Sequence, residues 1–254
     1  PGALRERGEA IATGLHGSIT LGAGQFCTKP GLVIIHEDEA GQAFIDRLAQ
    51  LMGVEQVFTL LNEGIERSYE EGKVRLEQTR EVKTLARPTL TPGPGCQTTA
   101  ALYQTTAASF LANPELQDEV FGPAALVITW STKDDLLRVI QALEGQLTAS
   151  LHASSADLLD FAGVLHSLEA RAGRLVFNGF PTGVEVCHAM VHGGPWPATS
   201  DGRSTSVGTR AIFRFTRQVC YQGFPDGSLP VELQNGNPTG IWRMVDGQLT
   251  QDSF

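Results

Sequence analysis

Residues 24–36 read GQFCTKPGLVIIH, which places one cysteine in a glycine-flanked turn directly before an apolar run. Apolar residues at helical spacing precede this turn and predict a helix over residues 4–15. The run Leu32–His36 predicts a buried strand. Glycines before the cysteine allow positive φ angles and a close approach of the backbone to a substrate. We therefore interpret Cys27 as a candidate nucleophile, although most free cysteines are small apolar core residues.

The alternation of helix and strand continues through the middle of the chain. Ser131 is the predicted N-cap of a helix that Gly145 ends. The Thr-rich residues 97–109 predict a half-exposed strand. The other expected elements are strands at 125–130, 147–152 and 174–178 and helices at 38–52 and 156–171. Apolar strands that alternate with amphipathic helices predict an α/β fold with a parallel sheet covered by helices.

The last third of the chain has a different character. Residues 179–210 are rich in glycine, proline and hydroxyl groups and show no periodic pattern, which is typical of a functional loop. Residues 211–222 alternate like an edge strand, and an exposed edge can pair with another chain. We expect a catalytic domain over residues 1–210, and an oligomerisation strand with a C-terminal tail over residues 211–254.

Composition excludes several classes of protein. The 254 residues carry a formal net charge of −9, which argues against nucleic acid as a partner. No apolar run has the length of a transmembrane helix and no signal-peptide pattern opens the sequence, so we expect no membrane partner. Four cysteines without a CxxC pair indicate reduced thiols and a cytoplasmic location.

Two more stretches follow the cysteine turn in order. They are Glu119-Val120-Phe121-Gly122-Pro123 and the end of the strand at Asn178, with the loop FNGFPTGVEVCHAMVHGGP that begins at Phe177. The ordered set resembles the catalytic domain of the aldehyde dehydrogenase superfamily. Together with DGRSTSVGT from Asp201, it is similar to one branch of that family, the α-ketoglutaric semialdehyde (2,5-dioxopentanoate) dehydrogenases and the related NADP-dependent fatty-aldehyde dehydrogenases.

The resemblance implies a role for several residues. Cys27 would be the nucleophile, and its backbone N–H would belong to the oxyanion hole. Glu119 would bind the nicotinamide ribose and Phe121 would lie near the nicotinamide ring. The residues implied for the aldehyde pocket are Phe26, Thr28, Phe180, Pro181 and Thr182. The cofactor would be NADP or NAD, and the intact enzyme would be a homo-oligomer acting on a small aldehyde.

The same resemblance implies that part of the machinery is missing. The family's general-base Glu and its dinucleotide-binding domain lie further upstream than Pro1, and no GxGxxG fingerprint follows a strand in this sequence. We therefore expect a C-terminal fragment that is inactive alone. In the intact enzyme, 2,5-dioxopentanoate would be oxidised to the carboxylate through a cysteine thiohemiacetal and a thioester. A fatty-aldehyde dehydrogenase, a CoA-acylating dehydrogenase and a non-catalytic scaffold of the same fold remain as alternatives.

Other polar residues are weaker candidates. His188 and His192, with Cys187 beside them, could indicate a metal site or a second nucleophile–base pair, but their spacing fits no standard zinc pattern. We expect no metal there, and we favour a pocket wall or a loop hydrogen bond. Lys29 could lower the pKa of the thiol at Cys27, and a solvated lysine that points away is an equal alternative.

Overall fold

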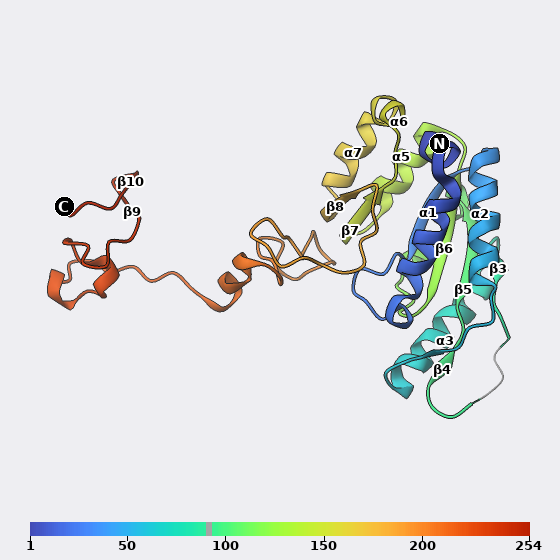
Figure 1. The fold of residues 1–254 in the computed structure, drawn as a ribbon, viewed down its shortest axis with the longest axis horizontal. Coiled ribbons are helices and arrows are strands. Elements are labelled where there is room, and N and C mark those ends of the chain that lie inside the picture. The colour runs from blue at the N-terminus through green and yellow to red at the C-terminus, as the bar shows by residue number, and fades with distance from the viewer. Residues whose placement is uncertain (90–92) are drawn as a thin grey trace. The chain divides into compact units, whose positions relative to one another are not determined.

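The computed structural model describes residues 1–89 and 93–254 and divides into two compact units, Pro1–Arg214 and Phe215–Phe254 (Figure 1). We describe each unit separately. The predicted domain boundary after residue 210 falls just before this division, and the assignment of roles to the two parts stays a prediction. Within the described residues, no helix combines the length and the apolar character that a membrane span requires.

The larger unit is built on a four-stranded sheet in the order β1-β6-β5-β3. Strand β1 (Leu32–His36) runs parallel to β6 (Ala124–Trp130), which runs parallel to β5 (Ala101–Thr106). Strand β3 (Lys83–Ala86) is antiparallel to β5. All seven residues of β6 are buried, as expected for a strand with helices on both faces. The predicted α/β class with a parallel sheet is confirmed.

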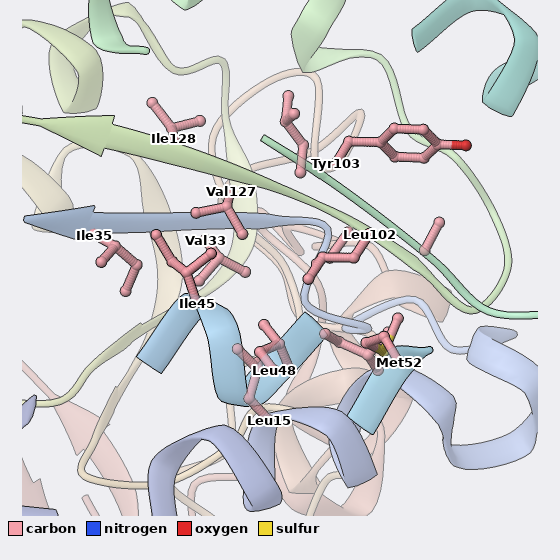
Figure 2. Packing of buried hydrophobic residues seen from close by; sticks show 14 of the residues in the cluster. Leu15, Val33, Ile35, Ile45, Leu48, Met52, Leu102, Tyr103, Val127 and Ile128 are labelled. Carbon is pink, nitrogen blue, oxygen red and sulfur yellow. The ribbon is translucent and has the colours of Figure 1, made fainter. Parts of the chain in front are cut away.

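Two helices at the start of the chain cover one face of this sheet. Helix α1 (Gly2–Thr20) packs against α2 (Glu39–Met52), and Figure 2 shows Leu15, Ile45 and Leu48 from these helices beneath the strands. Asp38 caps α2 by accepting a hydrogen bond from the N–H of Gly41 at 2.9 Å. Both helices and the strand between them follow the predicted pattern.

The strand predicted over residues 97–109 is shorter and more deeply buried in the structure, where it is β5 (Ala101–Thr106). The half-exposed strand expected over residues 97–109 is a shorter strand in the interior of the sheet, and it continues directly into α4 (Ala107–Ala112). Residues Ala101–Tyr103 are fully buried because β5 lies between β6 and β3. Upstream, β4 (Gln97–Thr98) pairs with β2 (Phe58–Thr59).

Helix α3 (Glu63–Gln78) lies in a stretch with no clear periodicity in the sequence. Asn62 caps it by accepting from the N–H of Ile65 at 3.0 Å. Its buried face consists of Tyr69, Gly72, Lys73 and Leu76. A lysine and a glycine on the buried face conceal the amphipathic pattern, which is why the helix was not predicted.

Helix α5 (Lys133–Ala142) corrects two predicted caps. Its N-cap is Thr132 rather than Ser131, because Thr132 and Asp135 form a reciprocal capping box. The helix ends at Ala142, so Gly145 does not cap it. A Cβ atom at Gly145 would lie 2.1 Å from the carbonyl oxygen of Pro195, and this close backbone approach explains the glycine.

A second, two-stranded sheet contains β7 (Gln146–Leu151) and β8 (Ala172–Phe177), which are parallel. The single helix expected between them is wrong, since α6 (Ser155–Asp160) and α7 (Ala162–Glu169) are separated at Phe161. The backbone of Phe161 is not helical. Its ring packs edge-on against that of Trp130, with the two ring centroids 5.8 Å apart. Leu158 of α6 and Leu165 of α7 are 37% and 41% exposed.

Short 3-10 helices complete the chain at Leu21–Gly24, Pro114–Gln117, Thr209–Phe215, Asp226–Ser228 and Val231–Leu233. The edge strand predicted over residues 211–222 is therefore wrong for this single chain: Thr209–Phe215 is helical and residues 216–222 have no regular structure. A strand needs a partner for its backbone groups, and alternation alone does not supply one. The smaller unit contains a hairpin of β9 (Arg243–Val245) and β10 (Gln248–Thr250).

The carboxylate of Asp157 is hydrogen-bonded to backbone N–H groups at the starts of two helices, α1 and α6. Its carboxylate accepts from the N–H groups of Gly2 and Ala3, both at 2.8 Å, and from that of Ser154 at 2.9 Å. Burial alone would raise the pKa of this carboxyl, but those N–H groups outweigh burial and hold the pKa below its usual value.

We expect Asp157→Asn to lower the free energy of unfolding by about 1–3 kcal/mol, because two helix caps weaken together. Since the folded pKa is depressed, the carboxylate stabilises the fold above about pH 4 and this contribution is lost as the pH falls below that value. Urea unfolding between pH 3 and 7 measures both effects. Asp160→Asn, exposed on the same helix, is the control, and equal losses for the two variants would contradict the capping role.

Candidate active site

The turn that presents Cys27 is formed by consecutive residues in an unusual backbone conformation. After α1 ends at Thr20, Gly22, Ala23 and Gly24 have φ angles of 57°, 59° and 68°. Left-handed conformations reverse the chain within a few residues, and only glycine adopts them without strain. The turn leaves Cys27 exposed and leads directly into β1.

The cysteine turn and the Glu119–Pro123 loop are in direct backbone contact. A Cβ atom at Gly24 would lie 2.3 Å from the carbonyl carbon and oxygen of Gly122. Gly122 has a φ angle of 156°, and a Cβ atom there would lie 2.3 Å from the ring of Tyr69. Glycine at both positions therefore permits the two predicted motifs to meet.

The buried side chain of Lys29 connects the cysteine turn to the Glu119–Pro123 loop and to the start of β6. Its ammonium group is buried and donates to the carbonyl oxygens of Val120 at 3.1 Å and Ala124 at 2.9 Å. Burial lowers the pKa of Lys29 to about 8, although the charge of Glu119 acts in the opposite direction. The alternative of a solvated lysine is wrong. Its hydrogen bonds to these carbonyls give Lys29 a structural role between the two motifs.

A histidine from the long loop reaches the thiol. The Sγ atom of Cys27 lies 3.2 Å from the Nε2 atom of His192. The loop holds His192 on both sides, because its N–H donates to the Thr205 hydroxyl at 2.8 Å and its carbonyl accepts from the N–H of Ser206 at 3.0 Å. Burial and the nearby charge of Arg174 lower the pKa of His192. A neutral imidazole at this distance can accept the thiol proton.

This pairing was not predicted from the sequence. The sequence suggests His192 as a partner of Cys187 or as part of a pocket wall, and the structure places it against Cys27 instead. The two residues are far apart in the chain, and His192 lies in a stretch without periodicity, so no local pattern connects them. His188 is exposed. Among residues 1–89 and 93–254, no three His, Cys, Asp or Glu side chains gather in a group that could hold a metal ion.

Three of the predicted pocket residues hold the long loop against the nucleophile turn and α1. The hydroxyl of Thr28 is buried and donates to the carbonyl oxygen of Pro181 at 3.0 Å. The hydroxyls of Thr182 and Ser18 lie 2.6 Å apart. These contacts bring Pro181 and Thr182 to the Cys27 side of the molecule.

Two aromatic residues complete the predicted pocket set. The ring of Phe180 lies against α1, where a Cβ atom at Gly14 would be only 2.3 Å from it. Phe26 folds back over Gly22, where a Cβ atom would lie 2.6 Å from the ring. A cleft of about 540 Å³ reaches Cys27, Thr28, Phe180 and Pro181 but extends far beyond them, between β1 and β7.

The two predicted cofactor residues lie on the loop that meets the cysteine turn. Glu119 is exposed and Phe121 is half-buried. The carboxylate of Glu119 is therefore accessible to a hydroxyl-bearing ligand, and the contact between Gly122 and Gly24 places this loop beside the nucleophile turn. The site therefore combines the thiol of Cys27, the imidazole of His192 and the carboxylate of Glu119. The loop that contains Phe180 lies against α1, the helix that leads to the thiol.

This sheet and this cysteine turn belong to the aldehyde dehydrogenase fold. The structure matches that of the Delta-pyrroline-5-carboxylate dehydrogenase from Mycobacterium tuberculosis with a TM-score of 0.69 at 16% identity, over 86% of this chain and 42% of that one. No protein-family model matches the chain.

Curated relatives are similar at the level of sequence. The chain is 47% identical over 248 residues to "Alpha-ketoglutaric semialdehyde dehydrogenase 2" of Azospirillum brasilense, which covers 98% of this chain and 47% of that protein. It is 45% identical over 253 residues to "Alpha-ketoglutaric semialdehyde dehydrogenase" of Acinetobacter baylyi, covering 99% of this chain and 48% of that protein. The chain belongs to the aldehyde dehydrogenase superfamily, and it spans about half the length of these relatives.

Proposed function

We propose that this chain is the nucleophile-bearing part of an NAD(P)-dependent aldehyde dehydrogenase that oxidises 2,5-dioxopentanoate, the α-ketoglutaric semialdehyde. The observation that carries the proposal is the exposed Cys27 thiol at 3.2 Å from His192, on a turn in contact with the Glu119 loop. The substrate rests on the names of relatives at 45–47% identity. A cytoplasmic location remains part of the proposal.

The residues of this chain account for the formation of the covalent intermediate. His192 accepts the thiol proton, and the thiolate attacks the aldehyde carbon to give a thiohemiacetal on Cys27. The backbone N–H of Cys27 is the proposed donor to the developing oxyanion. When bound, the oxidised nicotinamide supplies the hydride acceptor. The thioester left on Cys27 is then hydrolysed, which releases the carboxylate and frees the thiol.

Two residues of this chain fit the nicotinamide ribose and ring. The exposed carboxylate of Glu119 can accept hydrogen bonds from the ribose hydroxyls. The half-buried ring of Phe121 offers an apolar surface for the nicotinamide on the same loop. The choice between NADP and NAD, the base that activates water and the dinucleotide-binding domain belong, in this proposal, to the part of the relatives' length that this chain does not span.

The substrate test uses the longer enzyme. We expect reduction of nicotinamide, followed by its absorbance, to be fastest with 2,5-dioxopentanoate, at least tenfold above a long-chain aldehyde in kcat/KM. Faster turnover of the long-chain aldehyde would favour a fatty-aldehyde dehydrogenase. A strict requirement for coenzyme A would favour an acylating enzyme, and a folded enzyme that oxidises neither aldehyde would favour a scaffold.

The role of His192 can be tested on this chain alone, because alkylation of a thiol needs no cofactor. We expect His192→Gln to slow the reaction of Cys27 with iodoacetamide at pH 7 by about tenfold, since the thiol loses the neighbouring imidazole that can accept its proton. Mass spectrometry of the Cys27 peptide separates this thiol from the other three cysteines. His188→Gln is the matched control on the same loop, and an unchanged rate in His192→Gln would contradict the role of base.

We also propose that the enzyme is a homo-oligomer assembled through residues 211–254. This part of the chain exposes large apolar side chains, among them Phe215, Phe224 and Trp242. A surface of this kind is typical of a protein interface. Light scattering on the longer enzyme should give at least twice the monomer mass, and truncation before residue 211 should reduce it.

A further inference from the structure

One side chain of β8, that of Arg174, contacts two separate parts of the long loop. Its Nη2 atom donates to the carbonyl oxygen of Pro181 at 2.5 Å, and both Nη atoms donate to that of Gly183 at 3.2 Å. Its Nη1 atom also donates to the sulfur of Met190, a weak acceptor, at 3.8 Å. A planar guanidinium can bridge several acceptors because its N–H groups form a rigid fork. Arg174 therefore connects residues 181–183 with Met190.

The first of these two parts is bonded to the nucleophile turn. The carbonyl oxygen of Pro181 accepts from Arg174 and also from the hydroxyl of Thr28, the latter at 3.0 Å. Thr28 follows Cys27 directly and is buried. One carbonyl oxygen therefore connects Arg174 with the residue beside the thiol.

The second part carries the imidazole that contacts the thiol. Met190 precedes His192 by two residues, and Gly193 follows it. A Cβ atom at Gly173 of β8 would lie 2.0 Å from the carbonyl oxygen of Gly193, so the two backbones are in close contact. Strand β8 thus holds the loop before His192 through Arg174 and after it through Gly173.

A second interpretation of Arg174 is that it binds substrate, since 2,5-dioxopentanoate carries a carboxylate and arginine binds carboxylates well. The hydrogen bonds of Arg174 argue against this interpretation. Its two terminal nitrogens make four contacts with the loop. Its Nε atom is buried and has no hydrogen-bond partner among the described residues. A carboxylate would have to displace the loop to reach the guanidinium.

We propose that Arg174 is a positioning residue for the pair of Cys27 and His192. Its guanidinium holds residues 181–183 and Met190 in a fixed relation, which keeps the imidazole within hydrogen-bond distance of the thiol. This role rests on the proposed function of His192 as the base for Cys27. Burial and the charge of Arg174 also lower the pKa of His192, which keeps the imidazole neutral and able to accept a proton.

A double-mutant cycle on this chain tests the role, with the rate of alkylation of Cys27 by iodoacetamide at pH 7 as the measurement. We expect Arg174→Met to slow alkylation by about fivefold, because the imidazole is no longer held at the thiol. In the His192→Gln background the same replacement should change the rate by less than about twofold, since no base remains to be misplaced. A general loss of structure would change the rate in both backgrounds.

Arg171→Met is the matched control. Arg171 directly precedes β8, and its side chain donates to the carbonyl oxygen of Gln141 rather than to the loop. We expect this variant to keep the rate of the parent. Arg174→Lys keeps the charge, but one ammonium group lacks the fork that bridges the loop, so this variant should be slowed like Arg174→Met. If Arg174→Met is unfolded by circular dichroism, Arg174→Lys replaces it in the cycle.

Several results would overturn the role of Arg174. One is the parent's rate in Arg174→Met while His192→Gln is slow. Another is the parent's rate in Arg174→Lys while Arg174→Met is slow, which would assign the effect to charge alone. The parent's rate in His192→Gln would contradict the base itself, and Arg174 would then have no base to position.

The longer enzyme separates positioning from substrate binding. We expect Arg174→Met to lower kcat/KM by the same factor for 2,5-dioxopentanoate and for pentanal, which has no carboxylate. A loss confined to 2,5-dioxopentanoate would make Arg174 a ligand of the substrate carboxylate and would overturn the positioning role. An enzyme that oxidises neither aldehyde would contradict the proposed function, whereas the alkylation cycle would still decide the role of Arg174.

Discussion

Replacement of Cys27 by serine is expected to reduce aldehyde oxidation by the longer enzyme by a factor on the order of 10⁴ or more. The thiolate forms the covalent bond to the aldehyde, and a serine hydroxyl at the same position is far less nucleophilic at neutral pH. Removal of a nucleophile that acts with a base costs a large fraction of the rate enhancement. Nicotinamide absorbance with 2,5-dioxopentanoate is the measurement.

The matched control for this variant is Cys220→Ser. Cys220 is also an exposed free cysteine, so the same chemical change is made on the surface of the protein. We expect Cys220→Ser to keep its activity and both variants to keep the helical content of the parent by circular dichroism. If Cys27→Ser were as active as the parent, Cys27 would not be the nucleophile and the proposed mechanism would be wrong.

The second large effect is expected from Gly24→Ala. A methyl group at this position would lie 2.3 Å from the backbone of Gly122, and the residue has a φ angle of 68°. The left-handed conformation alone costs alanine about 1–2 kcal/mol, and the clash with a backbone carbonyl forces the two loops apart. We expect the unfolding free energy to fall by about 2–4 kcal/mol. Activity of the longer enzyme should fall by about 100-fold, because misplaced reacting groups are costly.

Gly17→Ala is the control for the glycine substitution. Gly17 lies in α1, and a Cβ atom there would meet no atom within 4 Å. Alanine favours a helix over glycine by about 1 kcal/mol, so this variant should be neutral or slightly more stable. Urea unfolding of the chain measures both variants. Equal midpoints for Gly24→Ala and the parent would show that the contact between the cysteine turn and the Gly122 loop can relax without cost.

Elements with strong local patterns were predicted well. The strand Leu32–His36 has the bounds that the sequence suggested, and the apolar run at residues 125–130 is the buried strand β6. The failures occurred where burial depends on distant residues. Phe161 interrupts a helix because Trp130 packs against its ring, and α3 was missed because Lys73 lies on its buried face. Neither contact leaves a periodic signal in the sequence.

The candidate site also has features that the sequence predicts and features that only the structure reveals. The sequence by itself determined the class of the fold, the position of the thiol on a glycine turn and the loop that carries Glu119, because these depend on neighbouring residues and on short motifs. Only the tertiary structure decided that His192 lies 3.2 Å from Cys27, that Lys29 is buried between two carbonyls, and that residues of β1 and β7 line one cleft. Local periodicity reports which face of an element is buried. Which loops meet depends on strand order and close packing, and both are set by contacts between residues far apart in the chain.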